Sequence, residues 1–202
     1  MNKLLKNITF ILLIGCIAVS VIIPAFGDEN PKAKEPVLVT SCGQSPGPLK
    51  MKIFMKRMKL DFDYNLHANV ADLKVKKEQG KPYQTMIIVT GASLKGMGAA
   101  GISIDDELKR ITDLLEEAKK QNIMVISAHI EGLARRSQGA SAGDNSDELS
   151  IDAVCPNSAM IIVRKDGNGD GRFTKISNDS NIPLMEFDKN LELGDLLKSI
   201  FE

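Results

Sequence analysis

The sequence has few of the residues on which several common kinds of site depend. Among 202 residues there is no tryptophan, there are three cysteines and two histidines, and aromatic residues make up 4%. This low cysteine content excludes a disulfide-rich mini-domain, and two histidines without ligand spacing argue against a catalytic zinc site. An excess of either charge is lacking too, because 26 basic residues balance 26 acidic ones. We therefore expect no nucleic-acid partner, since a neutral chain has no basic field to hold a phosphate backbone.

The first 27 residues have the pattern of a secretory signal peptide. Lys3 and Lys6 precede an apolar run over residues 8–23, and Ala25-Phe26-Gly27 offers the small residues of a cleavage site. Two alternatives stay open, because the run is nearly long enough to remain as a membrane anchor and Leu13-Ile14-Gly15-Cys16 is similar to a lipoprotein processing box. The sequence predicts an exported, extracytoplasmic protein in the periplasm or at the cell exterior, with membrane association through this segment if it is retained or lipidated.

The rest of the chain has the composition of one globular domain. Residues 28–35 are polar and are bordered by a proline, so we expect a short linker there. With 43% hydrophobic residues overall, the remaining chain can bury a proper core. We therefore expect a single domain over residues 36–202.

Short apolar runs rich in β-branched residues alternate with helical patterns in this domain. The runs are continuous, as in strands that are covered on both faces. The expected strands are 37–40, 85–90, 123–127 and 159–163, with weaker candidates at 62–66 and 182–187. The expected helices are 49–60, 104–118, 147–154 and 191–201. This order predicts a three-layer α/β domain, Rossmann-like or flavodoxin-like, with a mostly parallel sheet.

Small, polar and glycine residues gather directly after the expected strands. They occupy residues 41–45, 91–98, 128–132 and 166–171. The carboxyl ends of parallel strands share one edge of the sheet, where ligands bind in folds of this class. We therefore expect these four segments to form a ligand site at that edge.

The segment from Gly91 to Gly101 is the strongest candidate for holding an anion. It has four glycines, Ser93 and Lys95 in an expected turn that leads into a helix capped by Ser103. Backbone amides, a helix N-terminus and a lysine together suit a phosphate or a carboxylate. The order is not that of a Walker loop, and a G-x-G-x-x-G match beginning at Gly96 stands too far from its strand to indicate a dinucleotide site. Glycines that serve only a tight turn are the alternative.

His129 and an arginine pair are further candidates on the same edge. His129 follows a buried strand, where it would act as an acid or base, bind an anion, or simply make a structural hydrogen bond. Arg135 and Arg136 stand in a long polar connection and offer a fork for a carboxylate or phosphate. A solvated arginine pair is the alternative reading.

Asp166, Asn168, Asp170 and Gly171 match the front half of a calcium loop. The twelfth position of that loop is Ser177, where glutamate is needed. Ca²⁺ is therefore the one cofactor that the sequence suggests. The alternative is that this segment is an ordinary turn before a helix.

Cys42 and Cys155 are the cysteines outside the predicted leader. Cys42 follows the first strand and Cys155 precedes the fourth major one, so we expect them at opposite edges of the sheet and not joined. Cys42 is a candidate reactive thiol, with small-residue packing as the alternative.

The chain resembles an uncharacterised family of exported bacterial α/β proteins, a domain of unknown function. The resemblance covers most of the chain and is carried by residues 40–45, 93–101, 129–136, 146–147, 173–175 and 182–184. It implies the fold and export, and it implies no activity. The connection between Arg136 and Ser146 departs from the family pattern by its length.

Two functions remain open at this point. The first is binding of a small anionic metabolite, a carboxylate or a phosphate, at the carboxyl edge of the sheet. Its expected ligand-binding residues are Ser41, Gln44, Ser45, Ser93, Lys95, Gly96, Gly98, His129, Arg135 and Arg136. The alternative is an extracytoplasmic hydrolase or transferase of a small phosphorylated or carboxylated substrate, with His129 as acid or base and Ser93 or Cys42 as nucleophile. A nucleophile within hydrogen-bond reach of His129 would favour the enzyme.

Overall fold

A computed structural model of the chain describes residues 31–136 and 144–202. The predicted leader, residues 1–27, and residues 28–30 of the predicted linker lie outside the described residues. So does the middle of the long polar connection, residues 137–143.

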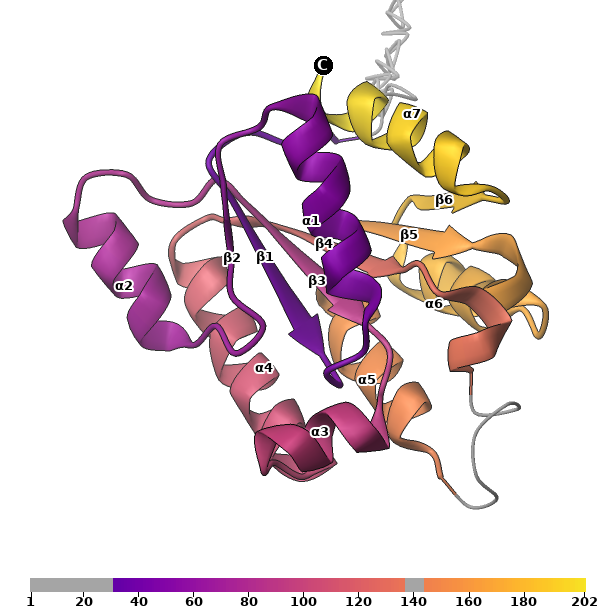
Figure 1. The fold of residues 1–202 in the computed structure, drawn as a ribbon. Helices are drawn as coiled ribbons and strands as arrows, with labels where there is room; N and C mark the ends of the chain where they lie inside the picture. Colours follow the sequence, from indigo (N-terminus) through magenta and orange to yellow (C-terminus); the bar gives the residue numbers. More distant parts are fainter. Residues whose placement is uncertain (1–30, 137–143) are drawn as a thin grey trace, which may run out of the picture.

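Within these described ranges, six strands form one sheet in which every neighbouring pair runs parallel (Figure 1). Their order across the sheet is β2-β1-β3-β4-β5-β6. The strands are β1 (Val37–Cys42), β2 (Phe62–Tyr64), β3 (Thr85–Thr90), β4 (Met124–His129), β5 (Met160–Arg164) and β6 (Leu184–Phe187). The predicted α/β fold with a parallel sheet is confirmed.

Helices cover both faces of the sheet and complete three layers (Figure 1). The helices are α1 (Gly47–Met58), α2 (Val70–Glu78), α3 (Leu94–Ala100), α4 (Ile104–Lys120), α5 (Ser146–Val154), α6 (Arg172–Ser180) and α7 (Asn190–Phe201). Short 3-10 turns are η1 (Gly132–Arg135), η3 (Cys155–Asn157) and η4 (Lys165–Asn168). α1 and α7 pack on one face, and α2, α4, α5 and α6 on the other.

Alternate residues of each central strand enter the two cores. Val37 and Val39 of β1 lie in the core beneath α1 and α7, whereas Leu38 faces α2 and α4. All six residues of β1 and of β3 are buried. This double burial explains why the strands read as continuous apolar runs.

The two strands at the switch point of the topology end side by side. β1 and β3 pair from Val37–Thr85 to Cys42–Thr90. The chain leaves β1 toward β2 on one side and later continues from β3 toward β4 on the other. In such sheets the crevice at this reversal is where ligands bind, so the loops after β1 and β3 are in the position to form a site.

Two helices depart from the prediction. The pattern did not indicate α2, whose capping box is formed by Asn69 and Asp72. The segment from Gly91 to Gly101, expected to be a turn, contains α3: Ser93 caps its N-terminus by accepting from the amide of Gly96, and Gly101 ends it with a φ of +67°. Two of the four glycines that suggested a loop, Gly96 and Gly98, are therefore helical.

The first described residues are attached to the domain. The amide of Ala33 donates to the carbonyl of Ile200 at 2.9 Å, and the amide of Lys34 donates to Oγ1 of Thr85 at 2.9 Å. These contacts join residues within the predicted linker to α7 and to the start of β3. Within 31–136 and 144–202, no helix has both the length and the apolar character to span a membrane.

Two glycines of α3 provide a matched test of this packing. A Cβ on Gly96 would lie 2.2 Å from the backbone oxygen of Gln44, whereas a Cβ on Gly98 would meet nothing within 4 Å. We expect Gly96→Ala to lower the free energy of unfolding by about 1–3 kcal/mol, since backbone must move. Gly98→Ala, the control, should raise it by about 0.5–1 kcal/mol through helix propensity. Urea unfolding of both variants checks this, and equal effects would contradict it.

Candidate functional site

The four predicted loops do meet along the carboxyl edge of the sheet. The amide of Ser93 donates to the carbonyl of Gly43 at 2.7 Å, which joins the loops after β1 and β3. The loops after β4 and β5 touch where Gly132 lies against Asp166, because a Cβ on Gly132 would be 2.0 Å from Oδ1 of Asp166. We call this row of loops the rim.

The first feature of the rim is a buried carboxylate from α4. Glu107 is 1% exposed, and its Oε1 accepts from the amide of Gly43 at 2.9 Å and from Nε2 of Gln44 at 2.7 Å. Nε of Arg110 pairs with Oε2 at 2.9 Å. The same guanidinium donates to the carbonyls of Ser41 and Ala68, both at 2.6 Å. This ion pair fixes the loop after β1 onto α4.

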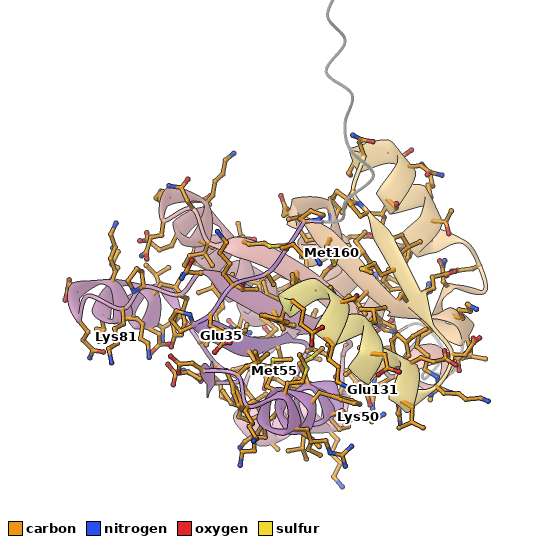
Figure 2. All side chains as sticks on the ribbon, turned by 90° about the horizontal axis from the view of Figure 1, so that it is seen from above. Glu35, Lys50, Met55, Lys81, Glu131 and Met160 are labelled. Carbon is orange, nitrogen blue, oxygen red and sulfur yellow. The ribbon has the colours of Figure 1, made fainter. Side chains whose placement is uncertain are left out.

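A second carboxylate lies at the N-terminus of α1. Oε2 of Glu131, which is labelled in Figure 2, accepts from the amide of Gly47 and lies close to Arg135. The distance to the amide is 3.2 Å, and the distance to Nε of Arg135 is 3.3 Å. Nη1 of Arg135 also donates to the carbonyl of Ala92 at 3.1 Å. Gly91 makes room for this arginine, because a Cβ there would be 2.8 Å from Cγ of Arg135. Glu131 thus links the loops after β1, β3 and β4.

A third carboxylate comes from the first turn of α5. Oδ1 of Asp147 accepts from the amide of Ala92 at 3.2 Å, and Oδ2 accepts no hydrogen bond from the described residues although Nε of Arg136 is 3.6 Å away. Burial raises the pKa of Asp147 to about 7, and the negative charge of Glu148 adds to this. Nearby, Oγ of Ser150 accepts from the amide of Gly91 at 3.2 Å. The amides of the β3 loop are thus satisfied from within the fold.

Arg136, predicted to bind a ligand, is the centre of an internal ion-pair network. It is 4% exposed, and it pairs with Glu148 at 2.9 Å and with Asp170 at 2.7 Å. It donates to the carbonyl of Gly167 as well, and its guanidinium lies 5.5 Å from the ring centre of Phe173. A buried arginine with these partners has little capacity for an external anion.

His129 is buried at the end of β4. It is 1% exposed, and its Nδ1 is 3.3 Å from Oγ1 of Thr90. Burial lowers the pKa of His129 to about 4, and the positive charge of Arg136 contributes. The imidazole is therefore neutral near pH 7, and Phe173 packs against it with ring centres 5.2 Å apart.

The remaining predicted ligand residues are mostly engaged in the fold. Oγ of Ser41 donates to the carbonyl of Leu66 at 3.3 Å, and Oγ of Ser45 accepts from the amide of Gly47 at 3.3 Å. Ser93 serves as the cap of α3, and Gly96 and Gly98 are helical positions in it. Lys95 is exposed and makes no ion pair with the described part of the chain. The structure therefore brings these residues to one edge without converging them on one point.

Neither predicted nucleophile lies in hydrogen-bond contact with His129. In the described ranges, Oγ of Ser93 accepts from the amide of Gly96 at 3.1 Å, and the hydroxyl near the imidazole belongs to Thr90. Cys42 and Cys155 are buried, free thiols, and burial raises the pKa of both. A buried thiol with a raised pKa is a poor nucleophile.

The three oxygen-bearing residues of the half calcium loop have separate partners. Oδ1 of Asn168 accepts from the amide of Phe173 at 3.0 Å, Asp170 pairs with Arg136, and Asp166 lies 3.2 Å from Nε of Arg164. Across the described residues, no group of three or more His, Cys, Asp or Glu side chains is placed to hold a metal ion. The structure supports the reading of this segment as a turn before α6.

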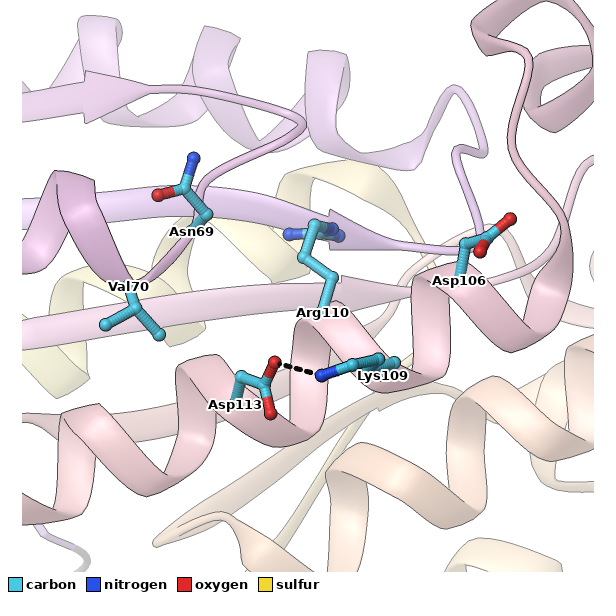
Figure 3. A pocket seen from close by; sticks show the side chains of 6 residues that line it. All are labelled: Asn69, Val70, Asp106, Lys109, Arg110 and Asp113. Atoms are coloured by element: carbon cyan, nitrogen blue, oxygen red, sulfur yellow. Dashed lines mark hydrogen bonds and ion pairs between the residues drawn. The ribbon is translucent and has the colours of Figure 1, made fainter.

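A separate hollow of about 340 Å³ lies between the starts of α2 and α4 (Figure 3). It is lined by Asn69, Val70, Asp106, Lys109, Arg110 and Asp113. Lys109 donates to Asp113 at 2.8 Å, and Arg110 reaches through to the rim. None of the predicted ligand residues lines this hollow.

Sequence reasoning missed the carboxylates that organise the rim. Glu107 was not singled out from the sequence, although it is four residues before Ile111 and seven before Leu114, both fully buried. An acid on the apolar stripe near a helix start was the available signal. Glu131 and Asp147 come from a loop and a helix start, where no periodic pattern marks burial.

This architecture is an α/β domain with a single parallel sheet, and the chain belongs to the family described as a domain of unknown function (DUF6305), whose model matches residues 34–201. The predicted resemblance to an uncharacterised family is confirmed. No curated protein sequence matches the chain.

Distantly similar solved structures are esterases. A psychrotrophic esterase EstA from Pseudoalteromonas sp. is 15% identical, with a TM-score of 0.34 over 77% of this chain and 78% of that chain. The acetyl xylan esterase AlAXEase is 13% identical, with a TM-score of 0.38 over 80% of each chain. AlinE4, an SGNH-hydrolase family esterase, is 10% identical, with a TM-score of 0.31 over 77% and 76%. Similarity at this level carries no argument about activity.

The Glu107–Arg110 pair is open to a direct test. Glu107→Ala leaves Arg110 and the amide of Gly43 without their acceptor in a buried place, so we expect the free energy of unfolding to fall by about 3–5 kcal/mol. Glu116→Ala, on an exposed turn of the same helix, should change it by less than about 0.5 kcal/mol. Chemical denaturation of the two variants checks this, and a small loss for Glu107→Ala would show that the pair is not structurally important.

His129 and Asp147 give opposite dependences of stability on pH. Because the pKa of Asp147 is raised, its contribution to the free energy of unfolding is complete below pH 3.8, the ordinary pKa of an aspartate. This contribution is lost as pH rises through about 7. Because the pKa of His129 is lowered, its contribution to the free energy of unfolding is complete above pH 6.5, the ordinary pKa of a histidine. This contribution is lost as pH falls through about 4. Between these limits the two slopes oppose each other in the wild type.

Removing either group should therefore expose the slope of the other. We expect Asp147→Asn, which keeps the oxygen that accepts from Ala92, to lose stability as pH falls from about 7 to about 4.5. His129→Gln should instead lose stability as pH rises over the same interval. Urea unfolding of the wild type and both variants across this range is the measurement, and three parallel profiles would contradict the assignment.

Proposed function

We propose that the chain is an extracytoplasmic binding protein for a small carboxylate or phosphate, which it holds at the rim in the place now taken by the side chain of Glu131. The observation that carries the proposal is the set of donors around that carboxylate. The amide of Gly47 is 3.2 Å from it, and the guanidinium of Arg135 is 3.3 Å from it. These donors bind an anion that the chain itself supplies.

The position of these donors supports a ligand site. They lie at the switch point between β1 and β3, where ligands enter sheets of this topology. Gly47 is the first residue of a twelve-residue helix, whose N-terminus favours negative charge. Ser45 adds a hydroxyl at the same point, since its Oγ contacts the amide of Gly47. Ser45 and Arg135 are two of the residues that the sequence predicted for the ligand.

Glu131 is placed so that a ligand can replace it. Its side chain is buried, at 9% exposure, but its partner Arg135 is 24% exposed, so the pair can be reached from the side of Arg135. Arg136 is more deeply buried and has three carboxylates near it. An incoming anion therefore competes with Glu131 for Arg135 and leaves Arg136 in place.

Binding is better supported than catalysis by the same geometry. His129 is neutral and buried, and the described hydroxyl within its reach is the buried Thr90. Ser93 and Cys42, the predicted nucleophiles, are used as a helix cap and as core. Export remains part of the proposal and is supported by the apolar pattern of residues 1–27.

The test replaces the internal anion by a neutral isostere. Glu131→Gln should bind inorganic phosphate or succinate about tenfold more tightly than the wild type, because the ligand no longer competes with a tethered carboxylate. Calorimetry and the ligand-induced rise in melting temperature measure this. Adding Arg135→Ala to Glu131→Gln should abolish the gain.

Glu116→Gln is the matched control, since it removes the same charge from an exposed site outside the rim. A gain of similar size in the control would reduce the effect to net charge and contradict the proposal. Absence of binding by Glu131→Gln would contradict it as well. Turnover of a phosphate or carboxylate ester by the wild type that is lost in His129→Gln would favour the hydrolase instead.

A further inference from the structure

The outward face of α1 combines exposed apolar side chains with positive charge. Leu49 and Ile53 are one helical turn apart and are 53% and 45% exposed. By helical geometry they lie opposite Met51 and Met55, which are fully buried beneath the helix; Met55 is labelled in Figure 2. Two large aliphatic side chains therefore face away from the core at the centre of one helix face.

Every ionisable side chain of α1 and its C-cap is basic. The helix has no aspartate or glutamate, and its basic residues are Lys50, Lys52, Lys56, Arg57 and the C-cap Lys59. At about 100° per residue, Lys52 and Lys56 flank the Leu49–Ile53 pair on one side. Lys50 and Arg57 flank it on the other. An apolar centre with basic residues on both flanks suits contact with an anionic membrane interface.

These charges have no counter-ion in the part of the chain that the structure describes. None of the five forms an ion pair there, and Lys52 instead lies 4.4 Å from the ring centre of Tyr64. Some basic residues elsewhere do pair, for example Lys76 with Asp63 at 2.6 Å and Arg172 with Asp152 at 2.5 Å, whereas Lys74 and Lys119 have no ion pair with the described residues either. α1 thus carries a local concentration of unpaired positive charge in a chain of zero formal net charge.

We propose that this face of α1 docks the domain onto the surface of an anionic phospholipid bilayer. Leu49 and Ile53 enter the boundary between headgroups and acyl chains, while the flanking lysines and Arg57 keep their charged ends at the lipid phosphates. An acidic protein would neutralise the charges, but the helix offers it only two isolated apolar residues and no groove. This inference is independent of the anion site at Glu131.

The experiment measures how the full chain partitions onto vesicles. Wild type should bind equimolar phosphatidylglycerol and phosphatidylcholine more tightly than pure phosphatidylcholine, and added salt should remove this preference. Neutralising Lys50, Lys52, Lys56 and Arg57 to glutamine should lower partition onto the anionic vesicles about tenfold or more. The double variant Leu49→Gln with Ile53→Gln should also weaken binding, because it removes apolar contact. Added salt, which screens only the charges, should not reproduce this loss.

A matched control removes the same charge from other helices. Lys74, Lys77, Lys119 and Lys120 are exposed and lie on α2 and α4, so their replacement by glutamine should leave partition within about twofold of wild type. A retained leader contributes equally to wild type and variants, so the comparison reports on α1. Circular dichroism and the melting temperature verify that each variant is folded.

Two outcomes would overturn the proposal. One is equal loss of partition in the α1 and control variants, which would mean that net charge alone governs binding. The other is binding of soluble polyglutamate by wild type without preference for anionic vesicles, which would assign this face to an acidic protein.

Discussion

The rim of this domain depends on buried carboxylates that accept hydrogen bonds from loop amides. The amides of Gly43, Gly47 and Ala92 follow parallel strands and have no partner within the sheet, and Glu107, Glu131 and Asp147 supply the missing acceptors. Buried amides must be satisfied, and a carboxylate does so strongly. The positions at which folds of this topology bind anionic ligands are therefore occupied by the chain's own carboxylates. In the structure the nearby arginines pair with these carboxylates.

Most of the fold could be predicted from the sequence because its signals are local. Continuous β-branched runs such as Thr85–Thr90 indicate strands buried on both faces, and the apolar stripe after Ser103 indicates α4. The segment of α3 was not recognised because its glycines suggested a turn. Its structure is decided by tertiary contact, since Gly96 packs directly on the backbone of Gln44.

The location of the site could be predicted from the sequence, but the pairing of its side chains could not. The topology rule put the loops after β1, β3, β4 and β5 on one edge, and they meet there. Which groups become partners depends on distances in the fold that sequence spacing does not encode: Arg136 and Asp170, an ion pair, are 34 residues apart, and the amide of Gly47 and its acceptor Glu131 are 84 residues apart. Arginines that looked available for a ligand are therefore engaged internally.

These sequence separations also bear on how the domain folds. The contacts that close the rim, Gly43–Glu107, Ala92–Asp147 and Gly47–Glu131, span 64, 55 and 84 residues. Each closes a long loop of chain and gains little until the strands beside it are paired. We therefore expect the rim to form late in assembly, with the acids hydrated while the sheet forms and dehydrated only when the finished edge presents them with amides.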